Sequence, residues 1–130
     1  MKPDFSQYSC ALFKEDHIVF KNDKPGLRPI FQCVTEFQHR EKIYELHDKI
    51  IGLAASKLII YGGFVKKVIT LIISKPAFQA LQMANILVEQ EQTVDNILNV
   101  EKDDICPMEK LALQTTDNYQ LFLKVQENYS

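Results

Sequence analysis

Long apolar runs are absent from this sequence, and their absence excludes a membrane-spanning helix. The best such run, Val68 to Ile73, contains a threonine and is far shorter than the roughly 20 residues that a helix needs to cross a bilayer. The first residues, Met1 to Asp4, also lack the apolar segment of a secretory signal. We therefore expect a cytoplasmic protein that does not act at a membrane.

Cysteine is scarce, and the spacing of the few cysteines excludes two kinds of site. The three cysteines are Cys10, Cys33 and Cys106, and no two of them form a C-x-x-C motif. This pattern argues against a thioredoxin-like redox pair and against a cysteine-rich zinc site. In the cytoplasm the three thiols should stay reduced. The sequence thus predicts no metal and no other cofactor.

An excess of basic charge is also missing. The chain has 15 lysine and arginine residues against 17 aspartate and glutamate residues, so its formal net charge is −2. Its pI is about 5.9. General nucleic-acid binders carry a basic face, and this charge balance argues against that function. The pair Gly62-Gly63 belongs to neither a Walker A nor a G-x-G-x-x-G loop, so it gives no sign of a phosphate-binding loop.

What is present is the composition of one soluble globular domain, residues 1–130. Of these residues 46% are hydrophobic and 25% are charged, and no repeat or long linker divides the chain. Short apolar runs at 10–13 and 18–20 predict a β-hairpin. A helix should begin near Pro29, which is followed by an apolar stripe at helical spacing. The stripe consists of Ile30, Cys33, Val34 and Phe37.

Two further helices and a central strand are predicted in the middle of the chain. We expect a helix from about Asp48, its N-cap, to about Tyr61, before the glycine pair. The nearly continuous β-branched run 65–73 is typical of a strand buried on both faces. The next helix is capped by Ser74 and turns three side chains inward. These side chains are Phe78, Leu81 and Met83.

The other segments complete a mixed pattern of helices and strands. Residues 38–45 are polar and are predicted to be a connection, while a strand within 86–94 carries a Glu/Gln run that favours an edge position. After a short strand near 97–98, helices are expected from Pro107 and from Asp117. This order favours an α/β fold, which we expect to be a three-layer α/β/α sandwich with a mixed sheet of about five strands.

The first candidate site is the predicted helix start within Leu46 to Ala55. There His47, Asp48 and Lys49 would share one turn. A helix N-terminus presents unpaired N–H groups and partial positive charge, so it can hold an anion or polarise a ligand. Asp48 would serve as an acceptor or base and Lys49 as a cation. The alternative is that Asp48 is only a cap and that its two neighbours are solvated.

The second candidate site is Cys106-Pro107-Met108-Glu109, at the start of another predicted helix. The helix dipole favours a thiolate at Cys106, and Glu109 could act as an acid or base or close a cap. A nucleophilic Cys106 would need a base, for which His47 is the nominee. The alternative is a half-buried cysteine beside a glutamate that complements the dipole. A third candidate is Arg28, which could clamp a phosphate or carboxylate bidentately. The alternative is a plain surface arginine.

Together the motifs Asp48-Lys49-x-x-Gly52-x-Ala54-Ala55 and Cys106-Pro107-Met108-Glu109 resemble a known family. It is the prokaryotic family called domain of unknown function number 1893, which is assigned to the cytidine-deaminase-like superfamily. The resemblance covers about residues 11–113 and leaves 115–130 as a C-terminal helical extension. It implies a single cytidine-deaminase-like domain with a mixed sheet of about five strands between helices.

The superfamily comparison also implies that the usual metal chemistry is missing. Zinc deaminases need a His or Cys followed by x-Glu at one helix start and Pro-Cys-x-x-Cys at the next. Here the first position would be His47-Asp48-Lys49, with lysine where glutamate is required. The second would be residues 76–80, which keep the proline but contain alanine in place of both cysteines. We expect no zinc and no deamination by the usual route.

Three functions are compatible with these residues, which do not name a reaction. The first is binding of a small polar metabolite or nucleotide-like ligand. Its ligand-binding residues would be Asp48, Lys49, Gly52, Cys106, Glu109 and Arg28. The second is a non-catalytic module that works through homo-oligomerisation. The third is a thiol-dependent enzyme, for which the candidate catalytic residues are Cys106, Glu109 and Asp48.

Overall fold

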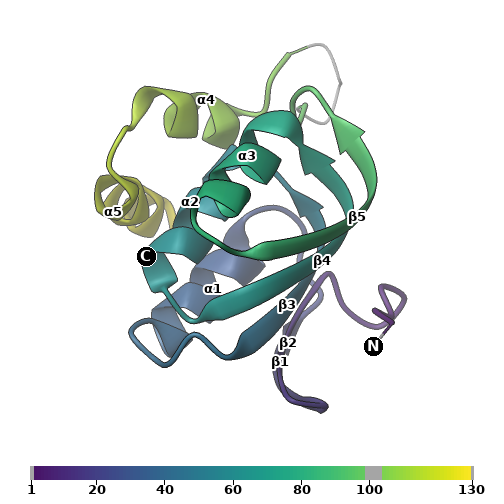
Figure 1. Ribbon diagram of the computed structural model, residues 1–130. Helices are drawn as coiled ribbons and strands as arrows, with labels where there is room; N and C mark the ends of the chain where they lie inside the picture. Colours follow the sequence, from purple (N-terminus) through teal and green to yellow (C-terminus); the bar gives the residue numbers. More distant parts are fainter. Residues whose placement is uncertain (1, 99–103, 130) are drawn as a thin grey trace.

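The computed structural model describes residues 2–98 and 104–129, which form an open sheet with helices beside it (Figure 1). The strands are β1 (Cys10–Lys14), β2 (His17–Asn22), β3 (Tyr44–Ile51), β4 (Val65–Ser74) and β5 (Leu87–Val94). The helices are α1 (Arg28–Phe37), α2 (Leu53–Gly62), α3 (Lys75–Met83), α4 (Pro107–Gln114) and α5 (Asn118–Tyr129). No helix within the described ranges is both long and apolar enough to cross a membrane.

The sheet has five strands in the order β2-β1-β3-β4-β5. Strand β1 is antiparallel to both of its neighbours, whereas β3, β4 and β5 are parallel. Helices α2 and α3 connect the parallel strands, because a parallel pair needs a crossover. The expected α/β fold with a mixed five-stranded sheet is therefore confirmed.

The layers are stacked differently from the expected α/β/α order. Helices α1, α2 and α3 lie along one face of the sheet, and α4 and α5 pack on α2 as an outer layer (Figure 1). On the opposite face, Phe5 and Tyr8 of the N-terminal segment pack on Ala11 and Phe13 of β1. The two C-terminal helices bury their apolar side chains against other helices, so they do not form a layer on that face.

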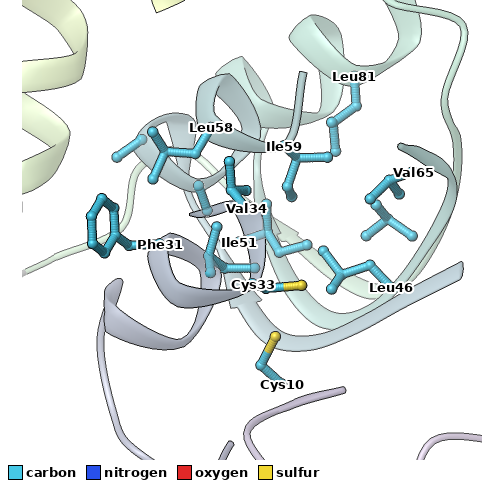
Figure 2. Close-up of a cluster of buried hydrophobic side chains, with 14 of the residues drawn as sticks. Cys10, Phe31, Cys33, Val34, Leu46, Ile51, Leu58, Ile59, Val65 and Leu81 are labelled. Atoms are coloured by element: carbon cyan, nitrogen blue, oxygen red, sulfur yellow. The ribbon is translucent and has the colours of Figure 1, made fainter. Parts of the chain in front are cut away.

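The main core lies between the sheet and the first helical layer (Figure 2). Leu46 and Ile51 of β3 belong to this core together with Leu58 and Ile59 of α2. Cys10 and Cys33 belong to the same core, and burial raises the pKa of both thiols. These two cysteines are thus packing residues.

The largest error of the sequence prediction concerns Asp48, which does not cap a helix. Residues 44–51 form β3, so the strand includes the last two residues of the stretch 38–45 that was predicted to be a connection. Helix α2 begins later than predicted, at Leu53, after the N-cap Gly52. Side chains alternate along this strand: Leu46 enters the main core, whereas His47 lies against the Phe13 ring on the opposite face. Pairing with β1 and β4 on both sides explains why a strand forms here.

Most other predicted elements are confirmed, with two corrections. The hairpin, the helix at Pro29, the central strand and the edge strand are present, and Gly63 ends α2 with a left-handed φ of 78°. The N-cap of α3 is Ser74, as predicted. Met83 does not turn inward, since it is 86% exposed at the last turn of α3. The strand near 97–98 is a single bridge between Leu98 and Ile105.

Candidate functional site

A cleft of about 860 Å³ opens beside the end of β3, where three helices begin. Leu27 lies before α1, Gly52 before α2 and Cys106 before α4, and all three residues line the cleft. In open α/β sheets, ligands bind in the crevice outside the carboxyl ends of the strands. The walls are mostly apolar. Among the side chains that form them are Ile30, Ile50, Ile97, Met108 and Tyr129.

Asp48 is the buried acid of this cleft. It lines the cavity although the residue is only 7% exposed. On the sheet it lies between Cys10 of β1 and Thr70 of β4. Burial raises the pKa of its carboxyl group well above the ordinary value, and a hydrogen bond from the backbone amide of Lys49 opposes that shift. An acidic group in such a place is typical of functional sites.

Glu109 closes the N-terminus of α2. Its carboxylate accepts hydrogen bonds from the amide of Leu53, at 2.6 Å, and from the amide of Ala54, at 2.8 Å. Burial raises the pKa of this carboxyl group, while the two amides and the ammonium of Lys57 act in the opposite direction. Glu109 therefore caps α2, and the prediction that it closes the cap of its own helix is wrong.

Lys57 makes the reciprocal contact at the other end of α4. Its Nζ donates to the carbonyl oxygens of Ala112, at 2.7 Å, and Thr115, at 2.6 Å. A cation thus satisfies the carbonyl end of α4, and an anion from α4 satisfies the amide end of α2. Sequence reasoning missed Lys57, because nothing in its local pattern distinguishes it from a surface lysine.

The other predicted site residues lie at the edge of the cleft or outside it. Lys49 is exposed and contributes to the lining, and Cys106 is half-buried at the N-cap of α4. Arg28 is exposed, and its guanidinium lies 4.8 Å from the centre of the Tyr129 ring. The structure therefore brings Asp48, Gly52, Cys106 and Glu109 together, as the two sequence motifs predicted, but gives Arg28 a packing contact.

His47 lies on the opposite face of the sheet and is not a base for Cys106. It is fully buried beside Phe13, where its Nε2 lies 2.8 Å from Glu45 Oε2 and its Nδ1 lies 3.3 Å from the hydroxyl oxygen of Tyr8. The alternation of apolar and polar residues over 44–47 is the signal that could have placed it there. No three His, Cys, Asp or Glu side chains within residues 2–98 and 104–129 form a group that could hold a metal ion.

Comparison with known proteins identifies the family. The model of the family described as Domain of unknown function (DUF1893), TM1506, matches residues 4–129, a longer stretch than the expected 11–113. The crystal structure of a DUF1893 family protein (TM1506) from Thermotoga maritima is similar, with a TM-score of 0.83 and 22% sequence identity. The likeness covers 95% of this chain and 82% of that one, and at this identity it shows the fold. No curated protein matches the chain. Since the family model spans nearly all of its residues, this chain belongs to the DUF1893 family.

Proposed function

We propose that this protein binds a small organic ligand in the cleft and that Asp48 is the main polar group that recognises it. The supporting observation is a carboxyl group that is almost wholly buried and faces a mostly apolar cavity. Burying an acid is costly unless it is well hydrogen-bonded, and the amide of Lys49, which also donates to Ser9, supplies little compensation. An N–H donor on a ligand would give this carboxyl group a further, stronger partner.

The shape and charges of the cleft favour a ligand with three parts. Its volume of about 860 Å³ suits a molecule of metabolite size, and its apolar walls suit a planar or apolar body. Lys24 and Lys49 line it, and α1 and α4 begin at it, so a negatively charged group would be stabilised near its edge. Nucleosides, nucleotides and related metabolites combine these parts. The proposed cytidine-deaminase-like relationship favours the same class by analogy.

Thermal-shift and calorimetric binding measurements would test the proposal. The panel consists of nucleosides, nucleoside monophosphates and sugar phosphates, tested on the unmodified protein, on Asp48→Asn and on the control Asp16→Asn. Asp16 is exposed in the β1–β2 turn, away from the cleft. A panel member should bind the first and third proteins and lose about tenfold or more of its affinity for Asp48→Asn. Equal binding to all three, or no binding by any compound, would refute the proposal.

Self-association is a second candidate function, which the two edges of the sheet favour. Strands β2 and β5 lie at these edges, where Ile18 is 49% exposed and Leu87 is 68% exposed. Edge strands offer unpaired backbone groups to a second chain. Light scattering at micromolar concentration tests this candidate, and a strict monomer would exclude it. The thiol-dependent alternative loses support, because the base nominated for Cys106 lies across the sheet.

A further inference from the structure

The first turn of α2 is built to hold an oxyanion. The amides of Leu53 and Ala54 point at the same carboxylate, and their two hydrogen bonds are short. Gly52 makes the room: a Cβ atom added there would lie 2.5 Å from Cδ and Oε1 of Glu109. We call Gly52, Leu53 and Ala54 the oxyanion site. In the structure Glu109 fills it with the chain's own carboxylate.

Glu109 belongs to α4, and contacts of two charged side chains hold this helix in place. Helix α4 packs mainly on α2, outside the layer that covers the sheet (Figure 1). Glu109 links the first turn of α4 to the amides of α2, and Lys57 of α2 donates hydrogen bonds to the last carbonyl groups of α4. Both contacts are between a charged side chain and backbone dipoles, so a competing anion at the oxyanion site would release one end of α4.

The oxyanion site also opens into the ligand cleft. Gly52, Ala54 and Glu109 line the same cavity as Asp48, whose buried carboxyl group independently indicates a ligand there. A molecule that donates to Asp48 could therefore place its own acidic group on the amides of Leu53 and Ala54, in exchange for Glu109. Phosphate and carboxylate groups both fit two converging N–H donors.

We propose that Gly52, Leu53 and Ala54 form a binding site for the carboxylate or phosphate group of a cleft ligand, and that Glu109 occupies this site until the ligand displaces it. Displacement frees the N-terminal end of α4, whose first turn lines the cleft. This inference rests on the proposed function for the identity of the cleft. Its tests, however, measure the binding of simple anions and the release of α4, and they do not depend on binding of the whole ligand.

The first test asks whether the site accepts a free anion. Glu109→Ala empties the oxyanion site, and sodium acetate or sodium phosphate is compared with sodium chloride at equal ionic strength. We expect the oxyanion to raise the melting temperature of this variant by about 3 °C or more and to shift the amide NMR signals of Leu53 and Ala54. The control Glu127→Ala alters an exposed residue of α5 and should show neither effect. A variant that responds equally to all three salts overturns the site, and the better of the two oxyanions identifies the ligand group.

The second test uses the unmodified protein, so it remains valid if Glu109→Ala does not fold. Cys106 begins α4 and is half-buried, whereas Cys10 and Cys33 are fully buried, so alkylation by iodoacetamide reports on the N-terminal end of α4. Acetate or phosphate should accelerate labelling of Cys106 severalfold relative to chloride. Lys57→Gln, which loosens the other end of α4, should increase this effect. A labelling rate that no anion changes overturns the displacement. Anion-dependent labelling without any nucleoside or nucleotide binding would refute only the proposed function.

Discussion

At the scale of single residues, the contact between Gly52 and Glu109 decides the geometry of the site. The backbone of Gly52 has a φ of −99°, which any residue can adopt, so the glycine is needed for space and not for conformational freedom. The space is filled by the carboxyl group of Glu109. A side chain at position 52 must therefore push that group away from the amides of α2.

This relation predicts the effect of Gly52→Ala. The new methyl group should displace the Glu109 carboxylate and lower the free energy of unfolding by about 1–3 kcal/mol. Because both variants remove the same contact, Gly52→Ala combined with Glu109→Ala should cost clearly less than the sum of the two single changes. Urea unfolding of the four proteins measures this coupling. Additive costs would show that the two residues act independently.

Some residues that the sequence singled out line the cleft, but Asp48 and Glu109 have structural roles there that differ from the predicted ones. Asp48 and Glu109 both line the cleft, as the two motifs predicted. Asp48 reaches it from a strand, however, because apolar residues at 50, 51, 54 and 55 fit a helix that begins at 48 as well as one that begins at 53. The bonds from Glu109 cross more than fifty positions of the chain, and no local pattern encodes such a contact.

At the scale of elements, local sequence signals predicted the ends of helices correctly where no long-range strand pairing competed with them. Pro29 lies in the first turn of α1 and Gly63 is the C-cap of α2, because these residues favour those backbone positions by themselves. Strand β3 was missed because its middle carries His47, Asp48 and Lys49, which are poor strand formers by composition. Hydrogen bonds with the neighbouring strands β1 and β4 stabilise the strand conformation of these residues.

The cap of α3 provides a prediction for an element that the sequence did locate. The Ser74 hydroxyl is buried and accepts a hydrogen bond from the amide of Ala77 at 3.2 Å. Ser74→Ala should therefore lower the free energy of unfolding by about 1 kcal/mol, without effect on ligand or anion binding. Thr116→Ala, at an exposed position between α4 and α5, is the control and should be neutral. A loss no larger than that of the control would mean that the cap contributes nothing to stability.

At the scale of the whole molecule, two buried acids link stability to pH. Burial raises the pKa of Asp48 above its ordinary value of 3.8 and that of Glu109 above 4.5. In both cases the folded state holds its proton more tightly than the unfolded chain does. The contribution of each group to stability is therefore full below its ordinary pKa and is lost as the pH rises through the folded-state value. The cleft is thus maintained at the expense of stability near neutral pH.

Asp48→Asn should reverse this loss, since asparagine fills the same volume without a charge to bury. We expect the free energy of unfolding at neutral pH to rise by about 1–3 kcal/mol, and its decline as the pH rises above the ordinary pKa of aspartate to become shallower. Urea unfolding from acidic to neutral pH, with Asp16→Asn as the exposed control, measures both effects. A gain in stability together with a loss of ligand binding would show that Asp48 is kept for function, because a residue that serves the fold alone would not weaken it. A destabilised Asp48→Asn with the original pH dependence would instead assign this carboxyl group to the fold.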